Sequence, residues 1–132
     1  MHLVVNNEAL VATMGSWPSF HDAHVLSAAL SGQTCRVTTH VFRSTDQVDA
    51  DGYYVLVDHH LVELEMRDVS ECSLPEDYDG DILFELTIQR DGDSTAVQLD
   101  SAVDPDRSWH VRCQAVAVTS VEPCDRSGKP AA

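Results

Sequence analysis

The stretch that decides the fold is ILFELTIQRDGDSTAVQL, residues 82 to 99. Apolar residues stand at every second position from Ile82 to Ile88, which is the period of a β-strand with one buried face. Residues 90–93 (RDGD) follow, and their Asp-Gly step supplies the left-handed backbone that tight hairpin turns need. Alternation resumes from Thr95 to Leu99, so the stretch predicts an antiparallel hairpin. The apolar face of its first strand is expected to carry Ile82, Phe84, Leu86 and Ile88.

The chain before this hairpin shows the same period. Residues 25 to 30 alternate before a turn at Ser31-Gly32-Gln33, and a second strand is predicted from Thr34 to Arg43. Two strands joined this closely predict another hairpin. One face of the second strand carries Cys35, Val37, Thr39 and Val41, and the other carries Arg36, Thr38, His40 and Phe42.

A polar, acidic loop is predicted from Ser44 to Gly52, and a long strand from Tyr53 to Val69. The apolar residues of this strand occupy odd positions up to Val57 and even positions from Val62 onward. A one-residue β-bulge at Asp58-His59-His60 explains the change of phase. The alternative is that Asp58 and His60 face inward.

The ends of the chain complete the predicted fold. A short helix is expected from Asn6 or Asn7 to Met14, with Gly15 ending it. A last strand is expected from Trp109 to about Val121, with a disordered tail over residues 126–132. Residues 1–125 thus predict a single β-rich domain, all-β or with one short N-terminal helix. Its expected architecture is an antiparallel sandwich or partly open barrel of about six to eight strands.

Acidic side chains dominate the composition. Twenty-two Asp and Glu stand against eight Lys and Arg, which gives a formal net charge of −14. This charge repels phosphate backbones and anionic lipids, so neither nucleic acid nor a membrane is expected as a partner. Two interpretations stay open: the acidity serves solubility, or it attracts a basic protein partner. The sequence shows no apolar span or signal-peptide pattern, which predicts a cytoplasmic protein, and self-association into a homo-oligomer stays open.

Metal-ligating side chains are present, but their spacing does not favour a site. The histidines that come closest to a ligand pattern are His21, His24 and His59. Neighbouring residues of a strand point to opposite faces, so His59 and His60 cannot both face one ion unless the bulge turns one of them. Four cysteines lie far apart, form no C-x-x-C pair and are expected to be reduced thiols: Cys35, Cys72, Cys113 and Cys124. We predict no metal and no cofactor.

Asp77, Asp79 and Asp81 alternate like the start of a calcium-binding loop. Such a loop would place glycine at position 82 and a bidentate glutamate at position 88, where this chain has Ile82 and Ile88. The pattern therefore indicates a solvated acidic turn.

Catalytic motifs are absent from the sequence. It contains no G-x-S-x-G nucleophile elbow and no glycine-rich phosphate loop, so the chain is not predicted to be an enzyme. The one candidate is the segment WPSFHDA at 17–23, in which His21 and Asp22 form an ionisable pair. A structural clasp at one end of the sheet is favoured over catalysis, because a buried His-Asp pair is more often satisfied than reactive. In that clasp Trp17 and Phe20 pack, Pro18 fixes the turn, and Asp22 accepts backbone N–H groups or orients His21.

Three motifs in one order resemble the bacterial immunity protein 50 family: WPSFHDA at 17–23, TDQVDADGYY at 45–54 and VEP at 121–123. Two departures from that family are seen. His24 stands where similar sequences carry an acidic residue, and residues 73–79 (SLPEDYD) replace a Gly-Phe-Asn and Gln-Asn pattern. If the replaced loop touches the partner, the identity of the partner has changed; if the loop is structural, the sheet edge differs.

The resemblance implies a protein that neutralises a toxin encoded beside it by stoichiometric binding, without turnover. Nuclease toxins usually present a basic cleft for phosphate, and an acidic rim would speed association with such a cleft and block it. The candidates for partner contact are Asp46, Asp49, Asp51, Asp77, Asp79 and Asp81. The motif residues with an expected structural role are Trp17, Pro18, Phe20, His21 and Asp22.

A second hypothesis is a small-molecule-binding or enzymatic β-domain that uses His21, Asp22 and His59 in a cavity. It requires a concave pocket into which at least two of these side chains project. A solid core at that place would exclude it.

Overall fold

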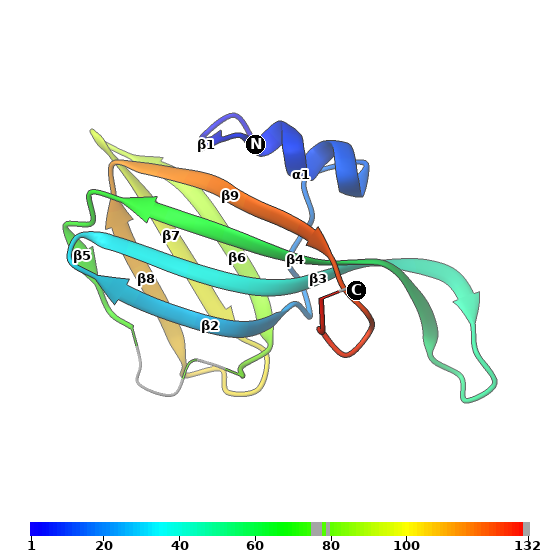
Figure 1. Ribbon diagram of the computed structural model, residues 1–132. Helices are drawn as coiled ribbons and strands as arrows, with labels where there is room; N and C mark the ends of the chain where they lie inside the picture. The colour runs from blue at the N-terminus through cyan, green and yellow to red at the C-terminus, as the bar shows by residue number, and fades with distance from the viewer. Residues whose placement is uncertain (75–77, 79, 131–132) are drawn as a thin grey trace.

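Two sheets form the body of the protein in a computed structural model, which describes residues 1–74, 78 and 80–130. One sheet has five strands in the order β1-β9-β4-β3-β2, and the other has four in the order β5-β8-β7-β6 (Figure 1). In chain order the elements are β1 Val4–Val5, α1 Asn7–Met14, β2 His24–Ser31, β3 Thr34–Val48, β4 Tyr54–Arg67, β5 Glu71–Cys72, β6 Leu83–Asp91, β7 Ser94–Ser101, β8 Ser108–Cys113 and β9 Ala115–Pro123.

The two sheets face each other across one hydrophobic core and do not close into a barrel, so the predicted sandwich is confirmed. The strands pair antiparallel throughout the described residues except for β1, which runs parallel to β9. The expected inner face of β3 is buried, from Cys35 to Val41, and packs toward the other sheet. Each fully buried Val or Leu side chain contributes about 1.5–3 kcal/mol to folding, which makes this core the main source of stability.

The helix α1 is confirmed, with Gly15 ending it in a left-handed conformation at φ 87°. Its apolar residues Leu10 and Met14 are buried, which fixes it against the sandwich. Asn6 precedes the helix, but its side chain donates a hydrogen bond to the carbonyl of Val118, 3.0 Å away, instead of capping the helix. The helices in the described part of the chain are too short or too polar to span a bilayer.

The predicted hairpin at 82–99 is confirmed as β6 and β7, but the buried face of β6 begins differently from the prediction. Leu86 and Ile88 are buried as expected, whereas Phe84 is 55% exposed and Leu83 is fully buried in its place. A register shift lies between Leu83 and Glu85, and one irregular step moves every side chain before it to the other face. The alternation in sequence could not reveal it, because Leu83 and Phe84 are both apolar.

The single last strand predicted from Trp109 to Val121 is wrong, because the chain changes sheets there. β8 belongs to the four-stranded sheet and β9 to the five-stranded sheet, with Gln114 between them. Buried side chains fall on odd positions up to Cys113 and include the even positions Val116 and Val118 afterwards. The change of phase therefore marks a crossing of the core.

The polar loop predicted from Ser44 to Gly52 is wrong as well. β3 continues to Val48 and β4 begins at Tyr54, so only residues 49–53 form the turn. Pairing of β3 with β2 ends at His40 and pairing of β4 with β9 ends at His60, so residues 42–58 form a two-stranded arm outside the sandwich, which we call the distal ribbon. Figure 1 shows it projecting beyond the body at the right of the view.

The chain after Pro123, where the sequence predicts a disordered tail from residue 126, folds back as a turn. Residues 124 and 130 form a β-bridge, and the Asp125 carboxylate accepts hydrogen bonds from the backbone N–H groups of Ser127 and Lys129 at 2.8 and 3.0 Å. In Figure 1 this C-terminal turn, residues 124–130, is the loop below β3 that follows the end of β9. It places a polar segment on the outer face of the five-stranded sheet.

Candidate functional site

The segment 17–23 joins the edges of the two sheets. Phe20 is buried, and its ring tilts against Trp17 with ring centroids 5.6 Å apart. Phe20 and Asp22 both have left-handed backbone, at φ 61° and 68°, which turns the chain sharply before β2. The N–H of Asp22 donates to the carbonyl of Leu83, and the N–H of Leu83 donates to the carbonyl of Ala23, both at 2.8 Å. The segment thus holds β2 to the start of β6.

The ionisable pair of this segment lies at the surface. His21 Nδ1 donates to the carbonyl oxygen of Phe84 at 2.9 Å, and its Nε2 lies 3.6 Å from Asp22 Oδ2, with both side chains more than half exposed. Ser19 Oγ accepts a hydrogen bond from the backbone N–H of His21, 3.2 Å away. The imidazole therefore contacts a carbonyl and a carboxylate, which is the environment of an anchored ring and not of a base activating a hydroxyl nucleophile.

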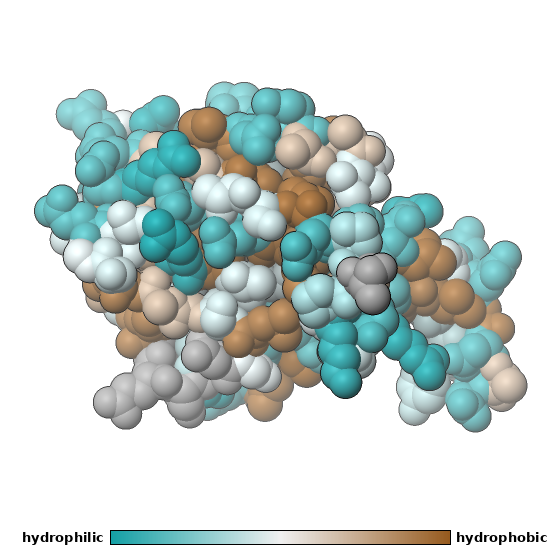
Figure 2. Space-filling model, viewed as in Figure 1, coloured by the Kyte–Doolittle hydropathy of each residue, from teal (hydrophilic) through white to brown (hydrophobic). Residues whose placement is uncertain are grey.

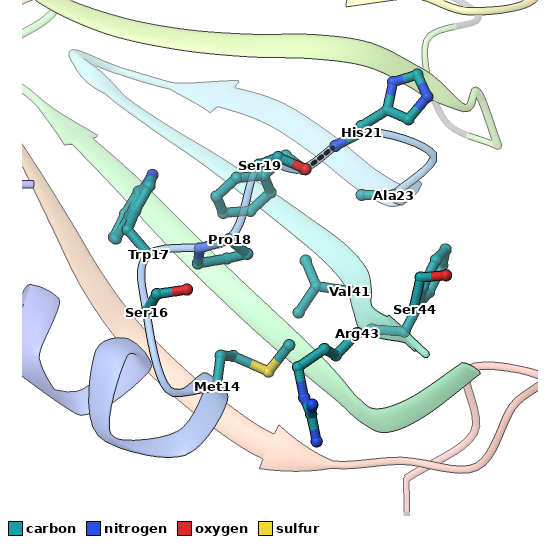
Figure 3. A pocket seen from close by; sticks show the side chains of 12 residues that line it. Met14, Ser16, Trp17, Pro18, Ser19, His21, Ala23, Val41, Arg43 and Ser44 are labelled. Carbon is teal, nitrogen blue, oxygen red and sulfur yellow. Dashed lines mark hydrogen bonds between the residues drawn. The ribbon is translucent and has the colours of Figure 1, made fainter. Parts of the chain in front are cut away.

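A first cavity of about 330 Å³ lies behind this segment, between Met14, the Trp17-Pro18 step and β3. Figure 3 shows Val41 and Arg43 on one side of it and Trp17 on the other, with the ring of His21 pointing away from the remaining side chains drawn. Arg43 is paired with Asp58, 2.9 Å away. The lining consists mainly of apolar and small polar groups, so this cavity offers little chemistry.

Three histidines meet on the outer face of the five-stranded sheet, and we call His24, His40 and His59 the histidine cluster. Nε2 of His40 and Nδ1 of His59 are hydrogen-bonded at 2.9 Å, and the rings of His24 and His40 lie 5.9 Å apart. Burial lowers the pKa of His40, and the neighbouring His59 and His24 lower it further, while Asp125 opposes them. Because His40 is buried, the cluster favours its neutral form.

The C-terminal turn covers this cluster. A Cβ atom at Gly128 would lie 3.4 Å from Nδ1 of His40 and 3.9 Å from the side chain of Leu26. Gly128 also has φ 87°, a backbone conformation that glycine adopts without strain. Glycine at this position therefore allows the turn to lie close enough to bury an imidazole that faces outward from the sheet.

Metal binding by the candidate histidines finds no support in the geometry. His24 and His59 both contact His40, whereas His21 makes its ring contact to Phe84 of β6. Within residues 1–74, 78 and 80–130, no group of three or more His, Cys, Asp or Glu side chains is arranged to hold a metal ion. All four cysteines have free thiols, and burial raises the pKa of Cys35 to about 12 and that of Cys113 to about 11. Such thiols are poorly reactive at neutral pH.

A β-bulge sits at the base of the distal ribbon, where the change of phase predicted it. Val41 pairs with His60 and Arg43 pairs with Val57, so two residues, Asp58 and His59, stand opposite Phe42. Asp58 has left-handed backbone at φ 56°, and its carboxylate pairs with Arg43. The bulge increases the twist of the strands, which bends the ribbon away from the sandwich.

The end of the distal ribbon combines exposed aromatic and acidic side chains. Tyr53 is 72% exposed and Tyr54 64%, with Val48 and Leu56 also exposed. Figure 2 shows hydrophobic residues at the surface of the projecting arm, beside hydrophilic ones. Asp46, Asp49 and Asp51 all lie on this arm and are exposed.

Asp81, another of the predicted acidic contacts, is buried and does not join this surface. Asp81 is 4% exposed, and its Oδ1 accepts hydrogen bonds from Ser101 Oγ and the N–H of Ile82 at 2.9 and 2.7 Å. Its carboxylate therefore links the loop before β6 to the end of β7, and it is not accessible to a partner. Asp77 and Asp79 lie outside the described residues.

A second, larger cavity of about 620 Å³ opens between the 19–24 segment, the distal ribbon and the C-terminal turn; we call it the ribbon groove. His21, Asp22 and His59 all line it, so the concave pocket that the second hypothesis requires is present. The remaining groups that line it are Ser19, His24, His40, Phe42, Ser44, Tyr53, Tyr54, Leu56, Ile82 and Arg126.

Sequence reasoning missed His40 and the exposure of the two tyrosines. A regular hairpin from the Ser31–Thr34 turn would pair His24 with Val41, but a register shift between Val25 and Ser27 pairs it with His40. The alternation of β3 places His40 on the face that points away from the core. That pattern does not reveal that the C-terminal turn covers this face.

A comparison with models of protein families, with characterised proteins and with solved structures finds no significant match.

Proposed function

We propose that the protein is an immunity-type inhibitor that neutralises a cognate bacterial toxin in the cytoplasm by stoichiometric binding, without turnover. The observation that carries the proposal is the distal ribbon, which holds exposed apolar and aromatic side chains away from the sandwich. Exposed apolar patches of this kind mark interaction surfaces in stable domains. The ribbon also contains residues 45–54, one of the three motifs that resemble the immunity protein 50 family.

Charge supports a basic partner. Asp46, Asp49 and Asp51 are exposed on the same ribbon as the two tyrosines, on a chain with a net charge of −14. A second copy of the chain would bring like charges to this surface, whereas a basic cleft would be attracted to it. In this arrangement the carboxylates set the association rate, and the tyrosines provide the buried contact that holds the complex together.

The experiment is co-expression with the product of the adjacent gene, followed by co-purification and a growth assay. The expected result is a 1:1 complex and restored growth. The paired change Asp46→Asn and Asp51→Asn is expected to slow association at low salt by about tenfold and to weaken its salt dependence, because two steering charges are lost. Asp49 is kept, because its Oδ1 accepts hydrogen bonds from the N–H groups of Asp51 and Tyr53 that form the turn.

The matched control removes two exposed acidic charges from the other sheet, Glu85→Gln with Asp93→Asn. It changes the net charge equally and should leave most of the association rate intact. Equal slowing in both double variants would mean that net charge, and not the ribbon, drives binding. Absence of toxicity in the neighbouring product, or absence of both protection and co-purification, would overturn the proposal.

A second candidate function is small-molecule binding in the ribbon groove, and the observation that favours it is the convergence of His21, Asp22 and His59 on one cavity. Its volume, about 620 Å³, lies within the range of small-molecule sites, about 300–1,000 Å³. An enzymatic version would need a base beside a nucleophile, and the contacts of His21 with Phe84 and Asp22 supply an anchor instead. A screen for ligands that raise the unfolding temperature tests this candidate; no stabilising ligand is the result that would count against it.

A further inference from the structure

The ribbon groove differs in charge from the rest of the molecule. Among its described lining residues are four of the seven histidines and one of the eight Lys and Arg, but only one of the twenty-two Asp and Glu. In a chain with a net charge of −14, this is a local concentration of hydrogen-bond donors with one guanidinium group and few carboxylates. The groove therefore favours a negatively charged ligand, whereas the acidic tip of the same ribbon favours a positively charged partner.

Nearby carboxylates are directed elsewhere. Asp125 turns its Oδ1 into its own loop, where it accepts hydrogen bonds from Ser127 and Lys129. Asp58, on the ribbon base, is paired with Arg43. Asp22, the one acidic residue among the described lining groups, lies beside Nε2 of His21. Among the described residues no carboxylate is paired with Arg126, and of these nearby carboxylates Asp125 is the one that acts on His40.

The groove also presents aromatic surface. Phe42 packs edge-on against His40 with ring centroids 5.8 Å apart and lies 5.8 Å from His59. Tyr53 and Tyr54 also line the groove, and both are largely exposed. Aromatic side chains pack well against a flat ring, in offset-stacked or edge-to-face contact. The hydrogen bond between His40 and His59 fixes two of the imidazoles before any ligand binds.

We propose that the ribbon groove binds a small aromatic carboxylate, with its ring against Phe42, Tyr53 and Tyr54 and its carboxylate toward Arg126 and the histidine cluster. The guanidinium group supplies paired N–H donors that match a carboxylate, and the imidazoles supply further donors. This inference rests on the second candidate function and names its class of ligand. The groove shares Tyr53 and Tyr54 with the surface of the toxin-binding proposal, but the two proposals name different ligands and are tested by different measurements.

The test uses three probes of nearly the same shape and different charge: benzoate, benzamide and benzamidine. Each is titrated into the full-length protein and followed by the NMR signals of the histidine rings and of the Gly128 amide. Benzoate is expected to shift these signals with a dissociation constant of about 1 mM, as its few atoms allow. Benzamide is expected to bind at least about fivefold more weakly, and benzamidine not to bind in the groove.

Arg126→Gln is the informative variant, because it removes the cation and keeps a polar side chain on an exposed turn. Benzoate affinity should fall about tenfold, as expected for loss of a charged hydrogen bond, while benzamide affinity should stay unchanged. Arg90→Gln, at the exposed end of β6, is the matched control and should have no effect.

Three results would overturn the inference: benzoate shifts confined to other parts of the molecule, no binding of any probe, or benzamidine binding as tightly as benzoate. Binding of benzamide or benzamidine in the groove at least as tightly as benzoate would keep the second candidate function and reject the anionic ligand. None of these results touches the co-purification test of the toxin-binding proposal, so the two can fail separately.

Discussion

The β6–β7 hairpin and the distal ribbon use the same antiparallel pairing, yet they treat their apolar side chains in opposite ways. Leu86 and Ile88 of the hairpin are buried against the facing sheet, whereas Tyr53, Tyr54 and Val48 of the ribbon are between 56 and 72% exposed. The difference arises because the five-stranded sheet covers the β6–β7 hairpin, whereas neither sheet covers the distal ribbon. Apolar residues in the ribbon therefore contribute little to folding, which leaves them available for a partner.

The largest expected difference between the two regions is in the free energy of unfolding that is lost when one leucine in each region is replaced by alanine. Leu99→Ala, in the core strand β7, is expected to lower the free energy of unfolding by about 3 kcal/mol, because Leu99 is fully buried and a cavity remains. Leu56→Ala, on the ribbon, is expected to cost less than about 1 kcal/mol, because Leu56 is already 39% exposed. Urea unfolding followed by circular dichroism measures both. Similar losses in the two variants would show that the ribbon packs against the body.

The sandwich could be predicted from the sequence because its strands alternate and its turns carry recognisable residues. Gly32 and Gly92 both have φ 61° in the two tight hairpins, the conformation that their Ser-Gly and Asp-Gly steps predict. The bulge at Asp58-His59 was also predictable, since a change of apolar phase inside one strand requires an inserted residue.

The same signal was not used at Gln114, where a change of phase has a different cause. At Gln114 the phase also changes, but there the chain passes from one sheet to the other. The extension of β3 over Ser44–Val48 was missed because an exposed ribbon has no buried face to impose alternation. Within the candidate site, His21, Asp22 and His59 could be singled out from the sequence, but their convergence with His40 and Arg126 depends on register shifts and on the C-terminal turn.

An effect of intermediate size is expected for alanine substitutions at two glycines with nearly the same backbone φ angle, Gly128 in the C-terminal turn and Gly52 in the ribbon turn. Both have φ close to 90°, but a Cβ atom added at Gly128 would lie within 4 Å of His40, whereas one added at Gly52 would meet open space. Gly52→Ala is expected to cost about 1 kcal/mol from backbone strain alone. Gly128→Ala is expected to cost slightly more, because its added methyl group would lie at the close limit of van der Waals contact with the buried ring of His40. Equal losses in urea unfolding would place the turn away from the cluster.

The smallest expected effect concerns the pH dependence of stability in the body. Burial lowers the pKa of His40, with His59 and His24 acting in the same direction and Asp125 against them. The unfolded chain then takes up a proton at higher pH than the folded protein does, so this stability is complete above the ordinary histidine pKa of about 6.5 and is lost as the pH falls through it. His40→Gln should flatten the fall in unfolding free energy between about pH 8 and pH 5.5.

His110→Gln is the control, because His110 is exposed on β8 and hydrogen-bonded to Ser73. It should keep the pH dependence of the original protein. A His40→Gln variant with an unchanged slope would show that the histidine cluster is not the titrating element.

The most direct test of the central claim measures the affinity of the purified protein for the product of the adjacent gene after the paired change Tyr53→Ala and Tyr54→Ala. These side chains are expected to provide the buried contact of the complex, together worth about 3 kcal/mol, so the dissociation constant should rise by about 100-fold or more. The urea midpoint should stay unchanged, because both rings are exposed in the free protein. An unchanged dissociation constant, with the folded state intact, would contradict a ribbon-mediated inhibitor.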